Sequence, residues 1–252
     1  MSILNTVVIV TATSYASMSD LRFGLAFKNL SKLHTFGYQV VVVDNSTPEV
    51  RAELQKTGVT VIAESQEDPD KKTTLGGVRR QVFLAALLQF PEVQAILWIE
   101  PEKDFATFVD VVTKPILEGR ARVVVPARMM IGWDSYPEFQ QHMEQVQNIA
   151  SQVHTGKYLD VSFGPVAYSI ETVKRFVLKV WDGVPDTYVV QYLPTFIERS
   201  HPGQVQSVPV SFFYPQEQRE LEESDPAMRT KRLKQLTQAL IAHEVLGTLP
   251  LR

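Results

Sequence analysis

The chain has 252 residues, 44% of them hydrophobic and 21% charged, and this composition excludes a disordered or fibrous protein. It contains no cysteine, which excludes disulfides, thiolate zinc sites, iron–sulfur clusters and a cysteine nucleophile, and which fits a reducing, cytoplasmic location. The formal net charge of −3, without a basic tail, argues against a nucleic-acid partner.

Short β-branched runs alternate with helical patterns through the first half of the chain. The runs cover residues 7–10, 40–43, 59–62, 95–99 and 122–125, and the helical patterns cover 20–34, a short segment from Pro48, 75–90 and a segment ending near Leu117. Residues 1–11 lack the basic start of a signal peptide, and no run approaches the 18 apolar residues of a transmembrane helix. The order predicts an α/β fold with a mostly parallel sheet and helices on both faces.

The last third of the chain adds longer helices and two further strands. We expect helices over 138–153, 171–180, 187–199 and 226–244, and strands over 163–169 and 205–213, where Pro209 favours a sheet edge. The inward-facing residues are predicted to be Phe139, Met143, Val146 and Ala150 in the first helix and Leu233, Leu236 and Leu240 in the last. With no repeat and no low-complexity linker, residues 1–252 are predicted to form one domain.

Polar side chains follow three of the predicted strands. Residues 11–15 follow the first strand, 44–46 the second and 100–104 the fourth. Ligands of open parallel sheets bind beyond the carboxyl ends of the strands, so we expect these groups to share one edge. At least four carboxylates would gather there, which is unfavourable unless a cation lies among them. Oxygen ligands of this kind suit Mg²⁺ or Mn²⁺ better than zinc.

Glu100 and Glu102 are the candidate metal ligands. Pro101 between them blocks a helix, and alternation along an extended stretch points both carboxylates the same way. Such a pair can hold one divalent ion that also binds phosphate oxygens; the alternative is a solvated turn. Asp44 also has two possible roles, because a strand-ending Asp either caps the next turn or accepts hydrogen bonds from a ribose or base.

The start of the helix over 75–90 is a candidate anion site. Residues 71–80 read Lys-Lys-Thr-Thr-Leu-Gly-Gly-Val-Arg-Arg. A glycine such as Gly76 lets a ligand approach the exposed amides of a helix start, and Arg79 or Arg80 supplies donors that match phosphate geometry. The alternative is a charged first turn on a surface helix, although basic residues there oppose the helix dipole.

Two charged segments near the carboxyl end are interpreted as solvent-facing. The basic run over 229–234 is predicted to be the solvated face of the last helix, and the acidic stretch over 217–225 a surface segment or a lid. An aromatic loop with Trp133, Asp134 and Tyr136 either stacks on a sugar or packs onto its own scaffold.

Taken in chain order, these motifs resemble those of the nucleotide-sugar-dependent glycosyltransferases of the GT-A fold, of the family 2 type. The first strand and its loop match the nucleotide-binding loop, here with Thr11, Thr13 and Tyr15. Asp44 follows the second strand in Val-Val-Asp-Asn-Ser, and Gly76-Gly77-Val78-Arg79-Arg80 follows the third. Glu100-Pro101-Glu102 stands where that fold carries an Asp-x-Asp metal motif. The resemblance covers residues 5–126 well and continues more weakly through Ser162-Phe163-Gly164-Pro165 and Asp186-Thr187-Tyr188.

The resemblance implies transfer of a sugar from a nucleoside diphosphate sugar to an acceptor hydroxyl. Tyr15 would stack on the base, Asp44 would bind the base or ribose, and Arg79 or Arg80 would offset charge on the leaving group. Glu100 and Glu102, with His201 as a possible third ligand, would hold Mg²⁺ or Mn²⁺; a solvated loop histidine is the alternative. Asp186 would be the catalytic base of an inverting reaction or would only position the acceptor.

The resemblance also divides the chain into a nucleotide-sugar-binding part, 1–126, and an acceptor-side part with the carboxyl-terminal helix, 127–252. The acceptor would be a small molecule, a glycan or a lipid-linked sugar, and a homo-oligomer is compatible. The sequence departs from the pattern in having Glu for Asp in the metal motif and a single acid at Asp186. The alternatives are therefore a sugar-phosphate nucleotidyltransferase and a non-catalytic nucleotide-sugar-binding protein. An oxidoreductase ranks last, because no Gly-x-Gly-x-x-Gly follows the first strand.

Overall fold

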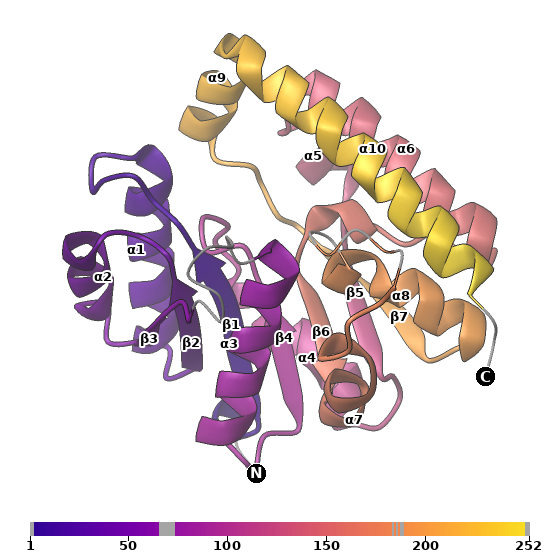
Figure 1. Ribbon diagram of the computed structural model, residues 1–252, viewed down its shortest axis with the longest axis horizontal. Coiled ribbons are helices and arrows are strands. Elements are labelled where there is room, and N and C mark those ends of the chain that lie inside the picture. The colour runs from indigo at the N-terminus through magenta and orange to yellow at the C-terminus, as the bar shows by residue number, and fades with distance from the viewer. Residues whose placement is uncertain (1–2, 66–73, 183, 185, 187–188, 250–252) are drawn as a thin grey trace.

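A twisted sheet runs through the centre of the molecule (Figure 1). The computed structural model describes residues 3–65, 74–182, 184, 186 and 189–249. Within them the sheet has seven strands in the order β3-β2-β1-β4-β6-β5-β7. Their bounds are β1 Val7–Thr13, β2 Gln39–Asp44, β3 Thr60–Ala63, β4 Ala95–Trp98, β5 Val123–Arg128, β6 Val166–Ser169 and β7 Val205–Val210. Only β6 is antiparallel to its neighbours in this described sheet, so the predicted mostly parallel α/β fold is confirmed.

Helices cover both faces of the sheet, as predicted (Figure 1). The helices that follow the strands are α1 Leu21–Thr35, α2 Pro48–Gln55, α3 Leu75–Gln89, α4 Val109–Leu117 and α5 Met130–Trp133. The remaining helices are α6 Glu138–Thr155, α7 Ile170–Thr172, α8 Val189–Ser200, α9 Gln216–Ser224 and α10 Pro226–Thr248. One cluster of buried apolar side chains joins α3, α8 and α10 to the sheet, and another joins α1, α2 and α4 to it.

The amino-terminal elements form where their sequences predict them. Asp20 caps α1 by accepting a hydrogen bond from the amide of Arg22, and Gly37 ends the helix region with a φ of 83°, which a residue with a Cβ rarely adopts. Every residue of β4 is buried, in agreement with a strand covered on both faces. These elements bring the carboxyl ends of β1, β2 and β4 to one edge of the sheet.

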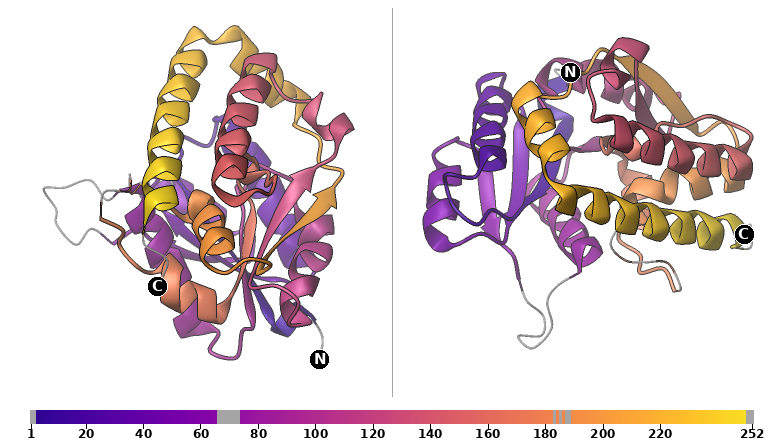
Figure 2. Two further views of the ribbon diagram at one scale, coloured as in Figure 1. Left: turned by 90° about the vertical axis from the view of Figure 1, so that its right-hand side faces the viewer. Right: turned by 90° about the horizontal axis from the view of Figure 1, so that it is seen from above.

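Two of the predicted inward faces are wrong. Val146 on α6 is 44% exposed and Leu233 on α10 is 54% exposed. The side chains that α6 buries are Gln140, Glu144, Gln147, Asn148 and Ser151, and those that α10 buries are Ala239, Ala242, His243 and Leu246. The reason is that α6 packs over a buried ion network rather than over an apolar layer, and α10 lies along α6 (Figure 2).

The other departures are local. The helix expected over 171–180 is the short α7 followed by a π-helical turn, Val173–Val177. The helix expected from residue 187 is described from Val189, and residues 187–188 lie outside the described residues. Pro209 does lie in an edge strand, β7. No helix of the described residues is long and apolar enough to span a bilayer.

Candidate functional site

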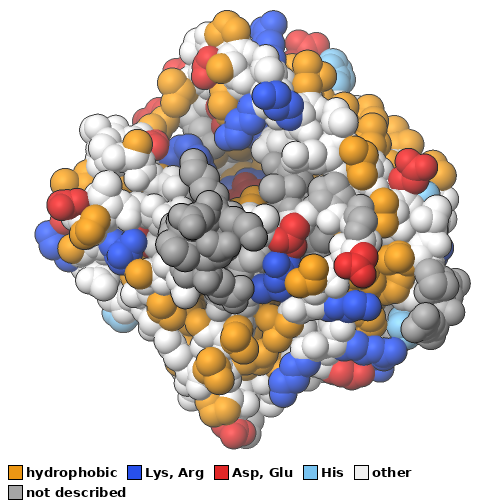
Figure 3. All heavy atoms as spheres, viewed as in Figure 1, with side chains coloured by type: hydrophobic (Ala, Val, Ile, Leu, Met, Phe, Trp, Pro, Cys, Tyr) orange, Lys and Arg blue, Asp and Glu red, His pale blue; other side chains and the backbone are white. Residues whose placement is uncertain are grey.

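A cavity of about 510 Å³ opens at the carboxyl ends of β1 and β4. The turn after β4 lines one side, the first turns of α3 another, and α6, α9 and α10 close it from above. The space-filling view shows this face hollowed near its centre, with acidic and basic side chains in and around the hollow (Figure 3). The cavity therefore lies at the sheet edge where the sequence predicts a ligand site.

The turn after β4 carries two carboxylates, each with a cation of the chain beside it. Glu100 Oε2 lies 2.9 Å from Lys103 Nζ. Burial alone would raise the pKa of Glu100, but the charge and hydrogen bond of Lys103 outweigh it and hold that pKa below its ordinary value. Burial would likewise lower the pKa of Lys103, and Glu100 raises it instead. Both groups are therefore charged at neutral pH, and the Glu100 side chain, 40% exposed, remains accessible from the cavity.

Glu102 is the more buried of the two. Its Oε1 accepts hydrogen bonds from Arg22 Nη2 at 2.6 Å and from the Tyr15 hydroxyl at 3.1 Å. Burial and the nearby Glu102 charge raise the pKa of the Tyr15 phenol well above its ordinary value. The ring of Tyr15 is 3% exposed and meets Phe23 edge to face. The stacking role predicted for Tyr15 is therefore wrong, because no face of the ring is open to a base.

Asp44 ties the ends of the first strands together. The carboxylate is wholly buried and accepts hydrogen bonds from Thr13 Oγ1 at 2.7 Å, Ser46 Oγ at 2.7 Å and Arg51 Nε at 3.2 Å. Thr11 Oγ1 donates to the carbonyl of Ile99 at 2.9 Å. Thr11, Thr13 and Asp44 do not line the cavity as the described residues shape it. Their contacts with a nucleotide stay predictions, while their observed bonds hold the cavity edge in place.

The predicted anion site at the start of α3 is filled by the chain itself. Thr74 caps α3, and its hydroxyl also bonds the carboxylate of Asp186. Arg80 pairs with the same carboxylate through two bonds, Nη1–Oδ1 at 2.5 Å and Nη2–Oδ2 at 3.0 Å. A Cβ on Gly76 would lie 1.9 Å from the Asp186 carbonyl oxygen, which explains the glycine. Residues 71–73, and Pro185, Thr187 and Tyr188 beside Asp186, lie outside the described residues.

This arrangement corrects the role predicted for Asp186. The hydrogen bonds from Arg80, against the opposing effect of burial and with help from Thr74, lower the pKa of Asp186. A carboxylate with a lowered pKa is a weaker base, and Asp186 does not line the cavity that the described residues form. Asp186 is therefore the anion that stabilises the start of α3, and its charge balances the charge of Arg80.

Arg79 lies where the sequence predicts a cation. Its side chain is buried, borders the cavity and places the guanidinium carbon 4.7 Å from the ring centroid of Trp98. Stacking on an aromatic ring fixes the orientation of a guanidinium without removing its charge. Arg79 is thus a fixed positive charge beside the carboxyl end of β4.

His201 lies at the wrong edge of the sheet for a metal shared with Glu100. It precedes β7, and its Nδ1 lies 2.9 Å from Ser200 Oγ. Strand β7 runs parallel to β5, and β5 runs in the direction of β4 because both pair antiparallel with β6. The residue before β7 and the residues after β4 therefore stand at opposite edges, and the predicted metal ligand is wrong.

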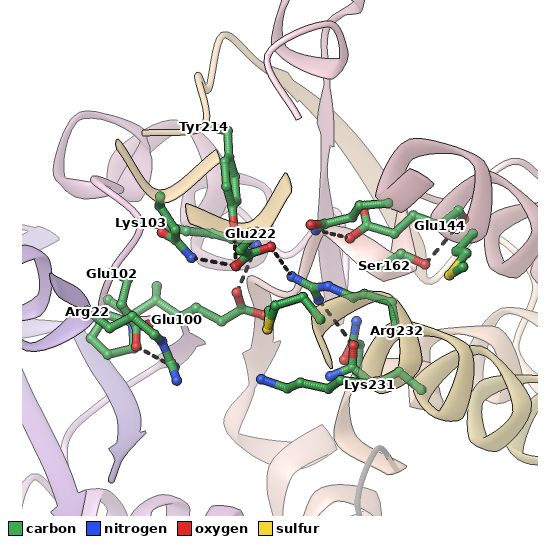
Figure 4. A pocket seen from close by; sticks show the side chains of 18 of the residues that line it. Arg22, Glu100, Glu102, Lys103, Glu144, Ser162, Tyr214, Glu222, Lys231 and Arg232 are labelled. Atoms are coloured by element: carbon green, nitrogen blue, oxygen red, sulfur yellow. Dashed lines mark hydrogen bonds and ion pairs between the residues drawn. The ribbon is translucent and has the colours of Figure 1, made fainter. Parts of the chain in front are cut away.

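Sequence reasoning missed the groups that α9 and α10 supply. Glu222 Oε2 pairs with Arg232 Nη2 at 3.1 Å, and Glu222 Oε1 accepts from the Tyr214 hydroxyl at 2.8 Å (Figure 4). Glu222 is buried and Arg232 is half-buried at the cavity, whereas Arg229, Lys231 and Lys234 are exposed, as the sequence predicts for this run. The available signal was the acidic stretch followed, after the Asp225–Pro226 break, by a basic run, because two such helices pair when the chain folds back.

The side chains that line the cavity also indicate how a divalent metal ion could bind there. No group of three or more metal-ligating side chains is assembled anywhere in the described residues. A magnesium-type ion needs no such group, because it keeps waters and is held by one or two carboxylates together with substrate phosphates. The exposed, ionised carboxylate of Glu100 fits that need, and Glu102 is beside it but held by Arg22. The donor set fits an ion that binds with its phosphate ligand and not before it.

Comparison with solved structures identifies the architecture. The chain superposes on Mycobacterium tuberculosis glucosyl-3-phosphoglycerate synthase with a TM-score of 0.63 at 14% identity, over 94% of this chain and 80% of that one. With a complex of the same enzyme with UDP the TM-score is 0.59 at 16% identity, over 93% of this chain and 80% of that one. With the complex of that enzyme with Mn²⁺, UDP-glucose and phosphoglyceric acid the TM-score is 0.57 at 16% identity, over 93% of this chain and 79% of that one. This chain has a GT-A fold.

The GT-A fold confirms the resemblance seen in the sequence, and at these identities it shows the fold alone. No protein-family model matches the chain, and no curated protein matches it in sequence. Because a fold does not fix a function, the function of this chain has to be inferred from its own cavity.

Proposed function

We propose that this protein is a glycosyltransferase that moves a sugar from a nucleoside diphosphate sugar to an acceptor hydroxyl with the help of a divalent cation. One observation carries the proposal: the accessible, ionised carboxylate of Glu100 and the fixed charge of Arg79 line one cavity at the carboxyl ends of β1 and β4. An anionic ligand with a bound cation matches this combination of opposite charges.

We propose UDP-linked sugar as the donor and Mn²⁺ or Mg²⁺ as the cation. Solved structures of the same fold are complexes with UDP, with UDP-glucose and with Mn²⁺. Glu100 would hold the ion against the diphosphate, and Arg79 would face the same phosphates. Residues 1–126 would bind the donor and residues 127–252 the acceptor.

In the reaction, the acceptor oxygen bonds to the anomeric carbon while the bond from that carbon to the diphosphate oxygen breaks. The acceptor proton leaves to the departing nucleoside diphosphate or to solvent. The bound cation supplies charge stabilisation to the leaving group. Arg79 adds to it, as an oriented charge in a cavity does, at a typical ~3–4 kcal/mol per well-placed group.

Binding of UDP tests the proposal. With Mn²⁺ present, UDP at about 100 times its Kd stabilises the protein by about 2.7 kcal/mol, a rise in Tm of about 5–10 °C for a chain of this size. Glu100→Gln removes the ion ligand, so this variant is expected to lose the part of the Tm rise that depends on Mn²⁺. Glu92→Gln, an exposed glutamate in the α3–β4 connection, is the matched control and should behave as the wild type.

Failure of UDP and of other nucleoside diphosphate sugars to raise Tm, with or without Mn²⁺, would contradict the proposal. Two further outcomes identify the alternatives. Binding of UDP-glucose without release of UDP in any acceptor mixture would mark a non-catalytic binding protein. Release of pyrophosphate from a nucleoside triphosphate and a sugar phosphate would mark a nucleotidyltransferase.

A further inference from the structure

The two long helices that close the cavity from above carry apolar side chains on their outer faces. α6 and α10 lie side by side (Figure 2), and the space-filling view shows apolar side chains gathered at the upper right, over these helices (Figure 3). Five of these residues, each between 38% and 77% exposed, are named the outer seam here: Val146, Ile149 and Val153 of α6, and Leu233 and Leu240 of α10.

Contacts at both ends of the two helices show which of their sides meet. The Arg229 guanidinium carbon of α10 lies 5.8 Å from the ring centroid of Phe139 on α6, and a Cβ on Gly247 would collide with the ring of His154. Arg229 and Phe139 are near the starts of their helices, and Gly247 and His154 are near the ends. The two helices therefore run in the same direction.

The outer seam lies along the line where the two helices meet. Val146 and Val153 follow Phe139 at spacings of seven residues, which is close to two helical turns, so they share the side of α6 that meets α10. The two leucines of the seam precede Gly247 at the same spacing, on the side of α10 that meets α6. Both rows of side chains remain exposed, so the seam forms one apolar stripe on the outer surface.

The surface around the outer seam is nearly free of charge. Within the described stretch 139–155 of α6, no exposed residue is a carboxylate, a lysine or an arginine. Within the described stretch 235–248 of α10, Glu244 is the only exposed one. The shorter helix α9, by contrast, exposes Glu217, Glu220 and Glu223. Depletion of charge together with exposed apolar side chains distinguishes an interface from a solvated surface.

We propose that the outer seam binds a second copy of this chain, so that α6 and α10 of two copies pack as a layer of four helices around a twofold axis. A twofold interface brings a surface against itself, and an uncharged apolar surface can do this without repulsion between like charges. An axis perpendicular to the helices reverses their direction. It would therefore place the basic start of α10, with Lys234, opposite the half that carries Glu244 of the partner subunit.

The size of the surface fits a dimer interface. α6 has 18 residues and so extends over about 27 Å, and two packed helices present a width of about 20 Å. The flat footprint is therefore roughly 540 Å², and the relief of the side chains brings the accessible area closer to the roughly 800 Å² per partner of a standard interface.

Sedimentation equilibrium of the full chain without nucleotide, at chain concentrations up to about 100 μM, measures the association. Ile149→Glu and Leu233→Glu each place a charge in the outer seam. Leu88→Glu is the matched control, because Leu88 is an exposed leucine of α3 outside the seam. All three side chains are exposed within a single chain, so the variants should fold, and far-UV circular dichroism verifies this.

The wild type is expected to be a dimer with a Kd in the micromolar range or below. Each of the two seam variants should weaken the association about thirtyfold or more, as the loss of a central apolar contact does. Leu88→Glu should stay within threefold of the wild type. The proposal goes beyond the proposed function and does not depend on it, because the association is measured without UDP.

A wild type that stays monomeric at the highest concentration would overturn the proposal. If that monomer binds phosphatidylcholine vesicles and Ile149→Glu does not, the outer seam is assigned to a bilayer surface instead. A dimer that both seam variants leave intact would overturn the proposal as well, because the two copies would then associate through another surface.

Discussion

Replacement of Arg128 tests why α6 buries a polar face. The Arg128 side chain is wholly buried and bonds Asp160 through Nε at 2.8 Å and Nη2 at 2.6 Å, and Glu144 through Nη1 at 2.6 Å. Its guanidinium carbon also lies 3.7 Å from the ring centroid of Trp133. Arg128 is the ion-pair partner of both buried carboxylates, and Glu144 lines the cavity.

Arg128→Met should therefore be strongly destabilising. Removing one partner of a buried ion pair costs about 3–5 kcal/mol, and a desolvated cation–π contact is worth about 2 kcal/mol. These contributions overlap, so we expect a loss of about 4–5 kcal/mol in the free energy of unfolding. For a chain of this length that is a fall in Tm of about 10–15 °C.

Urea unfolding followed by circular dichroism measures the loss. Arg120→Met is the matched control, because Arg120 pairs with Glu118 at 2.8 Å on the surface, where both side chains are exposed, and such pairs contribute little. A loss below about 2 kcal/mol for Arg128→Met would refute the reasoning, since it would mean that water replaces Arg128 without cost.

Three further predictions follow from the site. Gly76→Ala should destabilise the protein because its Cβ would meet Asp186, whereas Gly24→Ala, with nothing within 4 Å, should stabilise it by about 0.5–1 kcal/mol; thermal unfolding compares the two. Asp186→Asn should cost about 1 kcal/mol at pH 7, because the pKa of Asp186 is lowered in the folded state by Arg80. That contribution is fully present above the unfolded pKa of about 3.9 and is lost as pH falls through the lower folded value, so the variant and wild type should converge in unfolding titrations near pH 2. His201→Ala should leave the Mn²⁺ dependence of UDP binding unchanged in calorimetry, and a loss of Mn²⁺ dependence would contradict the edge assigned to His201.

The sequence predicts best where one local pattern decides the structure. The valine runs of β1 and β2 are buried on both faces, and Asp20 and Gly37 mark the ends of α1 as their chemistry requires. The carboxyl ends of parallel strands must share an edge, so Glu100 could be placed at the cavity from the order of elements alone.

Prediction failed where partners come from distant parts of the chain. The pairing of Asp186 with Arg80 spans 106 residues, and it turned a predicted base and a predicted phosphate ligand into a structural ion pair. The inward face of α6 was misjudged because its apolar residues were assumed to be buried, whereas Arg128 and Asp160 require polar neighbours. Within the basic run of α10, Arg232 alone was wrongly assigned to solvent, because nothing local indicates that it folds against Glu222.

The position of a bound ion tests the central claim most directly. Crystals grown with Mn²⁺ and UDP and measured at the manganese absorption edge locate the ion by its anomalous signal. The account predicts one peak within coordination distance of the Glu100 carboxylate and of the diphosphate, in the cavity beside Arg79. UDP bound there with no manganese peak near Glu100, or a peak at the His201 edge, would contradict it.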